Sequence, residues 1–574
     1  MAVERLVDSG VESVRPVWLP PLAPAISLDT VLDWDSPQTG SEHEAIEPPA
    51  EELKAFVGVK DVPREQQQGP AELDFTGAGG NMIVLGGPRS GKSLFLRTLI
   101  ASLSWRYPPG RVAIYAIDFG GGGLASLEDL PHVAGVAGRA DPEKVRRVVT
   151  DVRSQLDRRE RLFRRSRLDS PEALRRARAE GRVPKDVPGD VFLLIDGWSQ
   201  VREALGDSDD ELQDILNRGS ALGVHVIVTG TNSTQIRSRI QPLFGGRLEF
   251  KLTEAHDSGI DRHAADELPK DLPGRALLQD LSMAQIALPR IDGGTDDLDL
   301  REGMRDLVER ISDRWPDRAV SEVRILPTQI SYEDLVEKRA STKGLDLVIG
   351  LGEWDLEPAL LKPLQEPHLL VFGDPETGKS AFLRSIIRQL GEKPEEKVGI
   401  ILVDYRRAHL GLLEEGRALA YCTSPDHTKA VSAQLAEQLK ERVPGPDITP
   451  RQLRNRSWWK GKEIFVVVDD LDLLGSRNAN PLMPLVPLIA QGRDLGFHLI
   501  VARRTGGAGR SMFEPPMQTL NDMAVPAALF SGDRREGRLA HGVASQQLPQ
   551  GRALLVRRGK QPEQLQVPWS DEPA

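Results

Sequence analysis

Short apolar runs alternate with amphipathic stretches along most of this 574-residue chain. In its first half the apolar runs predict strands near residues 81–85, 111–117, 191–195, 224–229 and 247–252, and the amphipathic stretches predict helices near 92–104, 142–167 and 209–222. The runs are rich in Val, Ile and Leu with little alternation, which is typical of strands buried on both faces of a parallel sheet. The pattern therefore predicts an α/β fold, with mainly parallel sheets flanked by helices.

The same series of landmarks occurs twice along the chain. Gly86-Gly-Pro-Arg-Ser-Gly-Lys-Ser93 returns as Gly373-Asp-Pro-Glu-Thr-Gly-Lys-Ser380. Four later pairs keep the same order: 116–119 with 402–405, 191–196 with 464–469, 222–228 with 495–501, and 272–278 with 548–555. Five landmark pairs in one order at nearly constant spacing indicate a duplicated domain.

The repeat predicts the domain organisation. We expect one module at residues 55–310, a connector at 311–343 and a second module at 344–574. Residues 34–54 are polar and acidic without an apolar period, so they are predicted to be a flexible insert with no function. Residues 1–33 resemble the 305–335 stretch that follows the first module. They are therefore interpreted as the tail of an upstream module that is absent from this chain.

The glycine-rich segments 86–93 and 373–380 predict nucleotide binding. Both match the P-loop pattern Gly-x-x-x-x-Gly-Lys-Ser, and both follow a predicted strand and open a predicted helix. In such a loop, backbone N–H groups and the helix N-terminus bind the phosphates of ATP, and the lysine reaches the β- and γ-phosphates. The predicted ATP-binding residues are Gly86, Gly87, Pro88, Arg89, Ser90, Gly91, Lys92 and Ser93 in the first module, and Gly373, Asp374, Pro375, Glu376, Thr377, Gly378, Lys379 and Ser380 in the second.

A later strand in each module ends in an aspartate at the position of a Walker B acid. We expect Asp196 with Ser93, and Asp469 with Ser380, to hold Mg²⁺. The residue after this aspartate commonly supplies the carboxylate that polarises the attacking water. Here it is Gly197 in the first module and Asp470 in the second. Because losing a positioned base forfeits about 10²–10⁴ in rate, both sites are expected to bind ATP and hydrolyse it slowly, with residual activity at Asp470.

Other candidate residues have weaker signals. Thr229 and Asn232 follow the strand beside Walker B and are candidate sensors of the γ-phosphate, and Arg237 and Arg247 are candidate arginine fingers for a neighbouring site. The equivalent of Arg247 in the second module is Leu520, so that module lacks the finger. His225 and His498 occupy equivalent strand positions and are expected to be packed strand residues, because no second metal ligand lies nearby at ligand spacing.

Composition narrows the class of protein. A net charge of −11 argues against a broad nucleic-acid surface, and the single cysteine, Cys422, excludes an internal disulfide and is expected to be buried. No apolar run reaches the ~18 residues that span a bilayer, and the N-terminus does not read as a secretory signal. We therefore expect a cytoplasmic protein.

The arginines of residues 146–182 are mixed with acids and predict a solvated helix with i,i+4 ion pairs, or else a docking surface for an acidic subunit.

These motifs together resemble the FtsK/SpoIIIE ATPases, and more closely the EccC family of type VII (ESX) secretion systems, in particular its EccCb-like two-module subunit. The strings that carry the resemblance include Asp118-Phe-Gly-Gly-Gly-Gly-Leu124, Asp190-Val-Phe-Leu-Leu-Ile-Asp-Gly-Trp198 and Arg454-Asn-Arg-Ser-Trp-Trp459. The resemblance covers nearly the whole chain. It implies two tandem RecA/FtsK-like P-loop NTPase domains that bind ATP and Mg²⁺.

The resemblance also implies partners. They are an EccCa-like membrane-anchored ATPase subunit, which recruits the chain to the inner face of the membrane, and small WXG-type (Esx) substrates, whose C-terminal signal docks on the last module. It further implies a hexamer in the assembled system, and no nucleic acid is expected. The Met-rich stretch 512–530 is a candidate lining of the signal pocket, through Met512, Phe513, Met517, Val525 and Leu529, although core packing explains the same pattern.

Two other functions remain open from the sequence. The chain is also compatible with a double-stranded DNA translocase, which the acidic balance and the weakened Walker B ends disfavour. It is compatible, too, with a structural scaffold in which bound ATP only stabilises the modules. DNA-stimulated turnover is the result that favours the first, and tight binding without turnover is the result that favours the second.

Overall fold

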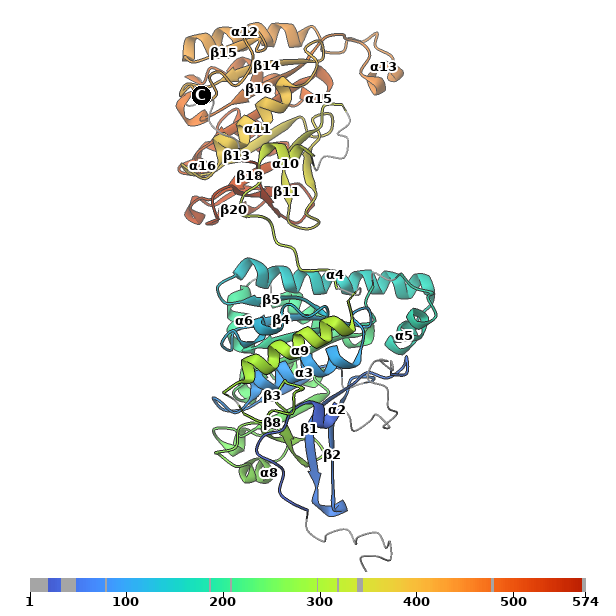
Figure 1. Cartoon of the computed structure of the whole chain (residues 1–574). Helices are drawn as coiled ribbons and strands as arrows, with labels where there is room; N and C mark the ends of the chain where they lie inside the picture. The colour runs from blue at the N-terminus through green and yellow to red at the C-terminus, as the bar shows by residue number, and fades with distance from the viewer. Residues whose placement is uncertain are drawn as a thin grey trace, which may run out of the picture. The chain divides into compact units, whose positions relative to one another are not determined.

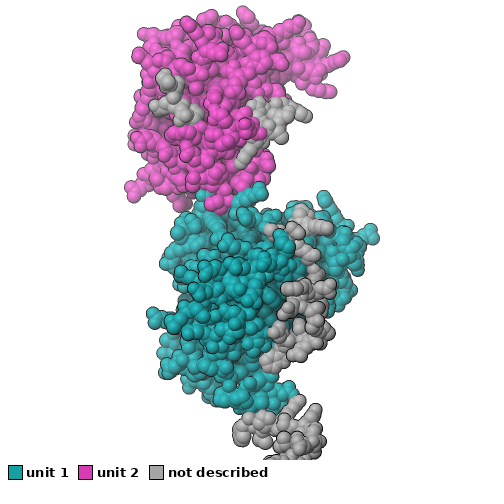
Figure 2. Space-filling view, in the orientation of Figure 1, with its two compact units in different colours: residues 1–324 teal, residues 325–574 magenta. Residues whose placement is uncertain are grey.

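The computed structural model describes residues 19–32, 48–77, 80–184, 187–206, 209–296, 298–316, 320–337, 344–475 and 479–569. The chain divides into two compact units, residues 1–324 and 325–574 (Figure 2). Each unit contains a ten-stranded sheet whose larger part is parallel, with helices on both faces (Figure 1). The predicted fold class, mainly parallel sheets flanked by helices, is confirmed.

The sheet of the first unit has the strand order β2-β1-β10-β9-β8-β3-β7-β6-β4-β5. Its strands are β1 (Lys54–Val62), β2 (Gln67–Asp74), β3 (Met82–Leu85), β4 (Val112–Asp118), β5 (Val133–Gly138), β6 (Asp190–Asp196), β7 (Val224–Gly230), β8 (Gly246–Phe250), β9 (Arg275–Leu278) and β10 (Met283–Ile286). The strands from β8 to β5 run parallel, whereas β9, β10, β1 and β2 extend the sheet antiparallel. The five strands predicted from apolar runs all lie in the parallel part.

Helices cover both faces of this sheet. They are α2 (Asp29–Leu32), α3 (Lys92–Arg106), α4 (Pro142–Ser166), α5 (Pro171–Ala179), α6 (Trp198–Leu205), α7 (Asp209–Arg218), α8 (Arg262–Glu267) and α9 (Leu300–Arg314). Side chains of α3 and α9 share one apolar core, and those of α4, α6 and α7 share the core on the opposite face. Figure 1 shows α3 and α9 side by side over the sheet.

The second unit repeats this plan with the strand order β12-β11-β22-β21-β18-β13-β17-β16-β14-β15. Its strands are β11 (Leu347–Gly352), β12 (Pro358–Leu361), β13 (His368–Phe372), β14 (Val398–Val403), β15 (Ala420–Cys422), β16 (Glu463–Val468), β17 (Phe497–Arg503), β18 (Ala527–Phe530), β21 (Arg552–Val556) and β22 (Glu563–Gln566), with β19 (Arg538–Ala540) and β20 (Val543–Ala544) as a separate hairpin. Its helices are α10 (Tyr332–Glu337), α11 (Lys379–Gly391), α12 (Pro425–Lys440), α13 (Pro450–Asn455), α14 (Val486–Ile489), α15 (Gly492–Leu495), α16 (Ala508–Ser511) and α17 (Met517–Asp522). The strand-by-strand match agrees with the sequence repeat.

The first described residues of each unit pack on the rest of that unit. Leu28 and Val31 are fully buried in the first unit's core, and Arg275 Nη2 donates to the Leu22 carbonyl at 3.0 Å. In the second unit, Arg552 Nη2 donates to the Leu326 carbonyl at 2.9 Å. Residues 19–32 are thus the head of a module, which corrects their interpretation as a tail. Residues 1–18 lie outside the described part of the chain, and for them that interpretation stays a prediction.

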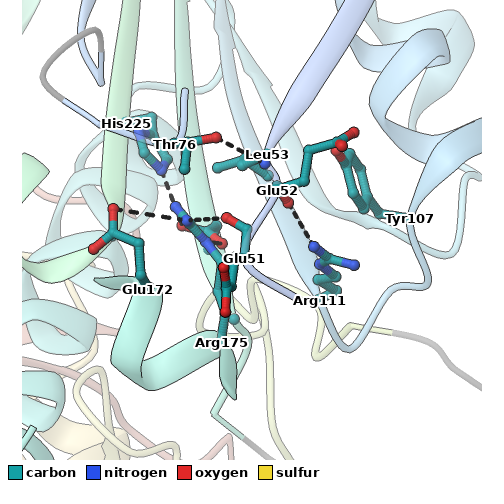
Figure 3. A network of polar contacts seen from close by, with 12 residues as sticks. Glu51, Glu52, Leu53, Thr76, Tyr107, Arg111, Glu172, Arg175 and His225 are labelled. Atoms are coloured by element: carbon teal, nitrogen blue, oxygen red, sulfur yellow. Dashed lines mark hydrogen bonds and ion pairs between the residues drawn. The ribbon is translucent and has the colours of Figure 1, made fainter. Parts of the chain in front are cut away.

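Part of the predicted flexible insert 34–54 is docked against the first unit. Arg111 donates to the carbonyl groups of Pro48, Pro49 and Glu52, and Leu53 is fully buried (Figure 3). Arg175 Nη1 donates to the Glu51 carbonyl at 3.0 Å. The prediction is wrong for residues 48–54, because main-chain carbonyls make these contacts and they leave no mark in the pattern of side chains. Residues 34–47 lie outside the described ranges.

The single cysteine and the strand histidines are packed, as the sequence predicts. Cys422 is buried, and burial raises the pKa of its thiol. His225 stacks on Phe192 and contacts Asp190, and His498 stacks on Phe465 and contacts Glu463. Within the described ranges, no helix combines the length and apolar character required to cross a bilayer.

The arginine-rich segment forms α4 and α5, where Arg159 and Arg175 are buried and the other ion pairs are exposed or half-buried. Glu160 and Arg164 form an i,i+4 pair at 3.7 Å, and Asp157 pairs with Arg218 of α7 at 3.2 Å. The solvated helix is therefore the better interpretation of these charges.

Candidate functional site

The first P-loop joins β3 to α3. Arg89 and Gly91 have φ values of +57° and +114°, and the equivalent Glu376 and Gly378 have +62° and +109°. These left-handed residues turn successive N–H groups toward one point, which makes an anion-binding concavity at the start of a helix. Lys92 Nζ donates to the carbonyl groups of Gly86 and Gly87, each at 2.7 Å. Burial lowers the pKa of Lys92, as expected for a cation held inside the loop.

Asp196 lies directly across from the P-loop serine. Ser93 Oγ donates to Asp196 Oδ2 at 2.6 Å, and Thr229 Oγ1 donates to Asp196 Oδ1 at 2.5 Å. The N–H of Gly197 in turn donates to Thr229 Oγ1 at 2.9 Å. One carboxylate oxygen therefore faces the serine while the other is fixed by Thr229, the candidate sensor residue.

The glycine loop after β4 borders this aspartate. Asp118 accepts hydrogen bonds from the N–H groups of Gly120, Gly122 and Leu124, and so holds the loop at the end of its strand. A Cβ added at Gly120 would lie 2.0 Å from Asp196 Oδ2. Only glycine fits there, because the loop backbone comes this close to the aspartate.

A cavity of about 460 Å³ opens beside the first P-loop, on the side of β8 and β9. Its lining includes Arg89, Ser90, Lys251, Lys270 and Arg275. Its volume is typical of a small-molecule site, and its cationic lining suits a phosphorylated ligand.

The second P-loop joins β13 to α11 with the same geometry. Lys379 Nζ donates to the Asp374 carbonyl at 3.2 Å, and Ser380 Oγ donates to Asp469 Oδ2 at 3.3 Å. Burial lowers the pKa of Lys379, against the opposing effect of Asp470 and Asp469. The serine–aspartate pair is thus present in both units.

Two side chains that the sequence gave no reason to single out contact the acids of the second site. His409 Nε2 lies 3.0 Å from Asp469 Oδ2, and Arg406 Nε lies 2.7 Å from Asp470 Oδ2. Burial raises the pKa of Asp469, but the hydrogen bond and charge of His409, together with Lys379 and a backbone N–H, lower it further, and the net pKa lies below the usual range. Burial and the adjacent Asp469 carboxylate raise the pKa of Asp470. Arg406 and His409 both come from the loop after β14, which stands where the first unit has the four glycines 120–123.

The other candidate residues lie elsewhere. Arg247 Nη1 pairs with Glu249 of its own strand at 3.5 Å, and Asn232 caps a short turn by accepting from the Gln235 N–H. Arg237 is exposed. Neither Arg247 nor Asn232 contacts Asp196 through a described hydrogen bond, so a role for Arg247 in a neighbouring copy stays a prediction.

The Met-rich stretch 512–530 is mainly core. Met512, Met517, Val525 and Leu529 are buried in one apolar cluster of the second unit, and only Phe513, which is 79% exposed, reaches the surface. These four side chains share their cluster with residues of α12 and of the sheet, and the assignment of the five residues to a signal pocket stays a prediction.

Both sites fit a magnesium nucleotide. Hydroxyl and carboxylate oxygens are the ligands that Mg²⁺ prefers, and the lysines and loop amides supply the phosphate contacts. Ser93 with Asp196 and Ser380 with Asp469 would hold the cation, which would neutralise part of the phosphate charge.

Comparisons with known proteins agree with these features. Residues 44–277 match the FtsK/SpoIIIE family. The ESX secretion system protein EccC of Thermomonospora curvata is 38% identical over 97% of this chain, which spans only 42% of that relative. The ESX-1 secretion system protein EccCb1 of Mycolicibacterium smegmatis is 33% identical over 98% of this chain and 95% of its own length. Among solved structures, Thermomonospora curvata EccC (ATPases 2 and 3) in complex with a signal sequence peptide has 37% identity and a TM-score of 0.80, covering 97% of this chain and all of that one.

Proposed function

This chain belongs to the EccC family of ESX (type VII) secretion ATPases, and we propose that it is the nucleotide-binding subunit of a protein-export motor that receives the C-terminal signal of WXG-type (Esx) substrates on its second unit. In this proposal it binds Mg-ATP at both P-loops and works beside an EccCa-like membrane-anchored ATPase. That partner recruits it from the cytoplasm to the inner face of the membrane, where the assembled motor is hexameric. The chain regulates the upstream ATPase module and has slow hydrolysis of its own.

The observation that carries the proposal is a difference between the edge strands of the two sheets. In the first unit the connector runs along the outer edge of β5: Val320 N–H donates to the Pro131 carbonyl at 2.8 Å and Val323 N–H to the Ala134 carbonyl at 2.7 Å. The Val323 side chain is buried among the apolar residues of β5 and α4. A short extended segment with one apolar anchor thus completes this edge.

The equivalent edge of the second unit carries no such segment among the described residues. β15 is the last strand of its sheet, and beside it Cys422, Leu435 and Leu485 are buried in the apolar core, with Val431 partly buried against them. Leu419, next to β15, is 52% exposed. An extended signal peptide can add to this edge as a strand, with an apolar side chain against the exposed Leu419 and the partly buried Val431. The relative solved with a signal sequence peptide supports the same class of ligand.

Peptide binding to the full chain tests this function. A fluorescent C-terminal peptide of a WXG-type substrate is expected to bind saturably, and Val431→Asp is expected to weaken the peptide affinity by at least about 30-fold, because the charge would lie where an apolar side chain of the peptide packs beside β15. Ala433→Asp, on an exposed position of the same helix, is the matched control and should leave the affinity unchanged. Equal binding by both variants contradicts docking at β15. Binding of duplex DNA with steep salt dependence, and none of peptide, favours the translocase instead.

A further inference from the structure

The two nucleotide sites support their Walker B aspartates in different ways. In the first unit Ile195 and Val228 are paired across β6 and β7, and in the second Val468 and Val501 are paired across β16 and β17. The next residue along β7 is Thr229, and the next along β17 is Ala502. These are equivalent positions, but only Thr229 has a hydroxyl that can fix the aspartate.

In the second unit His409 fixes the aspartate from another direction, at the carboxylate oxygen that also faces Ser380. Its ring is 2% exposed, and its Nε2 lies 3.0 Å from Asp469 Oδ2. The backbone N–H of His409 donates to Asp404 Oδ2 at 2.8 Å, and the Tyr421 hydroxyl donates to the same oxygen at 2.7 Å. Asp404, at the end of β14, therefore fixes the loop that aims the imidazole. The first unit has only glycines at 120–123, so no side chain of that loop segment reaches Asp196.

The other contacts of Asp469 do not replace this one. Its Oδ1 atom is buried and has no hydrogen-bond partner in the described part of the chain. Ser380 lies 3.3 Å away, and this hydroxyl is itself an expected cation ligand. When the serine turns to the cation, His409 is the side chain that still fixes the carboxylate.

We propose that His409 is the positioning residue for Asp469, so that Mg-ATP binding at the second site depends on His409 as binding at the first site depends on Thr229. The inference rests on the proposed nucleotide function of the second site. Partners that orient a metal-binding carboxylate typically contribute about 10–100-fold to metal affinity. In this pair of sites a hydroxyl in one and an imidazole in the other perform the same task.

The test measures binding of a fluorescent ATP analogue to the full chain with Lys92→Ala, so that only the second site reports. The affinity is measured in Mg²⁺ and in EDTA. His409→Ala is expected to reduce the gain in affinity that Mg²⁺ gives by about 10–100-fold and to leave the affinity in EDTA unchanged. The unchanged EDTA value also shows that the unit is folded. His409→Gln, whose amide N–H can reach the same oxygen, is expected to keep most of the Mg²⁺ effect, and it serves if the alanine variant does not fold.

Rescue separates positioning from a merely structural role. Adding Ala502→Thr to His409→Ala is expected to restore the Mg²⁺ effect by supplying the hydroxyl of Thr229, whereas the isosteric Ala502→Val should not. In a Lys379→Ala chain, Thr229→Ala should cause the same loss at the first site. An unchanged or increased Mg²⁺ effect in His409→Ala overturns the inference alone. Absence of nucleotide binding in the chain that retains His409 overturns the proposed function of this site, and the inference with it.

Discussion

Asp470→Asn is expected to lower steady-state ATP turnover of the chain by about 10²–10⁴-fold, the usual contribution of a positioned base. Asp470 is the carboxylate that follows the Walker B aspartate, and the first unit has Gly197 at that place. Burial and Asp469 raise the pKa of Asp470, which brings it closer to that of a base working at neutral pH. Asparagine keeps the shape and tolerates the left-handed backbone of this position, where φ is +53°, so the change removes little besides the charge.

Two lysine variants show which site is responsible. Lys379→Ala should abolish the same turnover, whereas Lys92→Ala should leave it nearly unchanged, because the first site has no base after Asp196. The turnover of all three variants is measured as the rate of phosphate release from Mg-ATP. Turnover that follows Lys92 instead of Lys379 contradicts the assignment of Asp470. Turnover absent from the unmutated chain, together with tight binding, favours the nucleotide-stabilised scaffold.

The central strands and the phosphate loops could be predicted because their signal is local. A buried parallel strand must be apolar along its whole length, and a phosphate loop needs glycine, lysine and serine at fixed spacing. The repeat supports these predictions, because each P-loop and each Walker B strand of one module has a counterpart in the other. Asp196 and Asp469 consequently lie where expected, facing Ser93 and Ser380.

The contacts of the loops that follow β4 and β14 could not be predicted in this way. Nothing in the string Arg406-Arg-Ala-His409 shows that its side chains meet two acids about 60 residues later along the chain, because the crossover of the sheet brings them together. The Met-rich stretch 512–530 is a related case. An apolar pattern predicts burial against something, but it does not distinguish the chain's own core from a pocket for another chain.

Arg175, which donates to the Glu51 carbonyl, is also one half of a buried ion pair. Arg175 Nε lies 2.8 Å from Asp190 Oδ2, both side chains are at most 1% exposed, and His225 contacts the same carboxylate. Burial raises the pKa of Asp190, but the bonds from His225 and Arg175 bring it down to about 2. Arg175→Met keeps the apolar volume and leaves this charge with one partner fewer. It is expected to lower the free energy of unfolding of the first unit by about 3–5 kcal/mol, as when a buried pair is broken.

The adjacent arginine is the matched control, because Arg176 pairs with Glu51 at 2.6 Å in a geometry that is more than half exposed. Arg176→Met should therefore cost only about 0.2–1 kcal/mol. Urea unfolding measured by tryptophan fluorescence compares the two variants. The pKa of Asp190 is depressed in the folded state, so the pair stabilises fully above the ordinary aspartate range and less as the pH falls toward 2. The difference between the variants should shrink in that direction. Equal costs at neutral pH would mean that packing of residues 48–54 on the sheet, and not the ion pair, stabilises this edge of the unit.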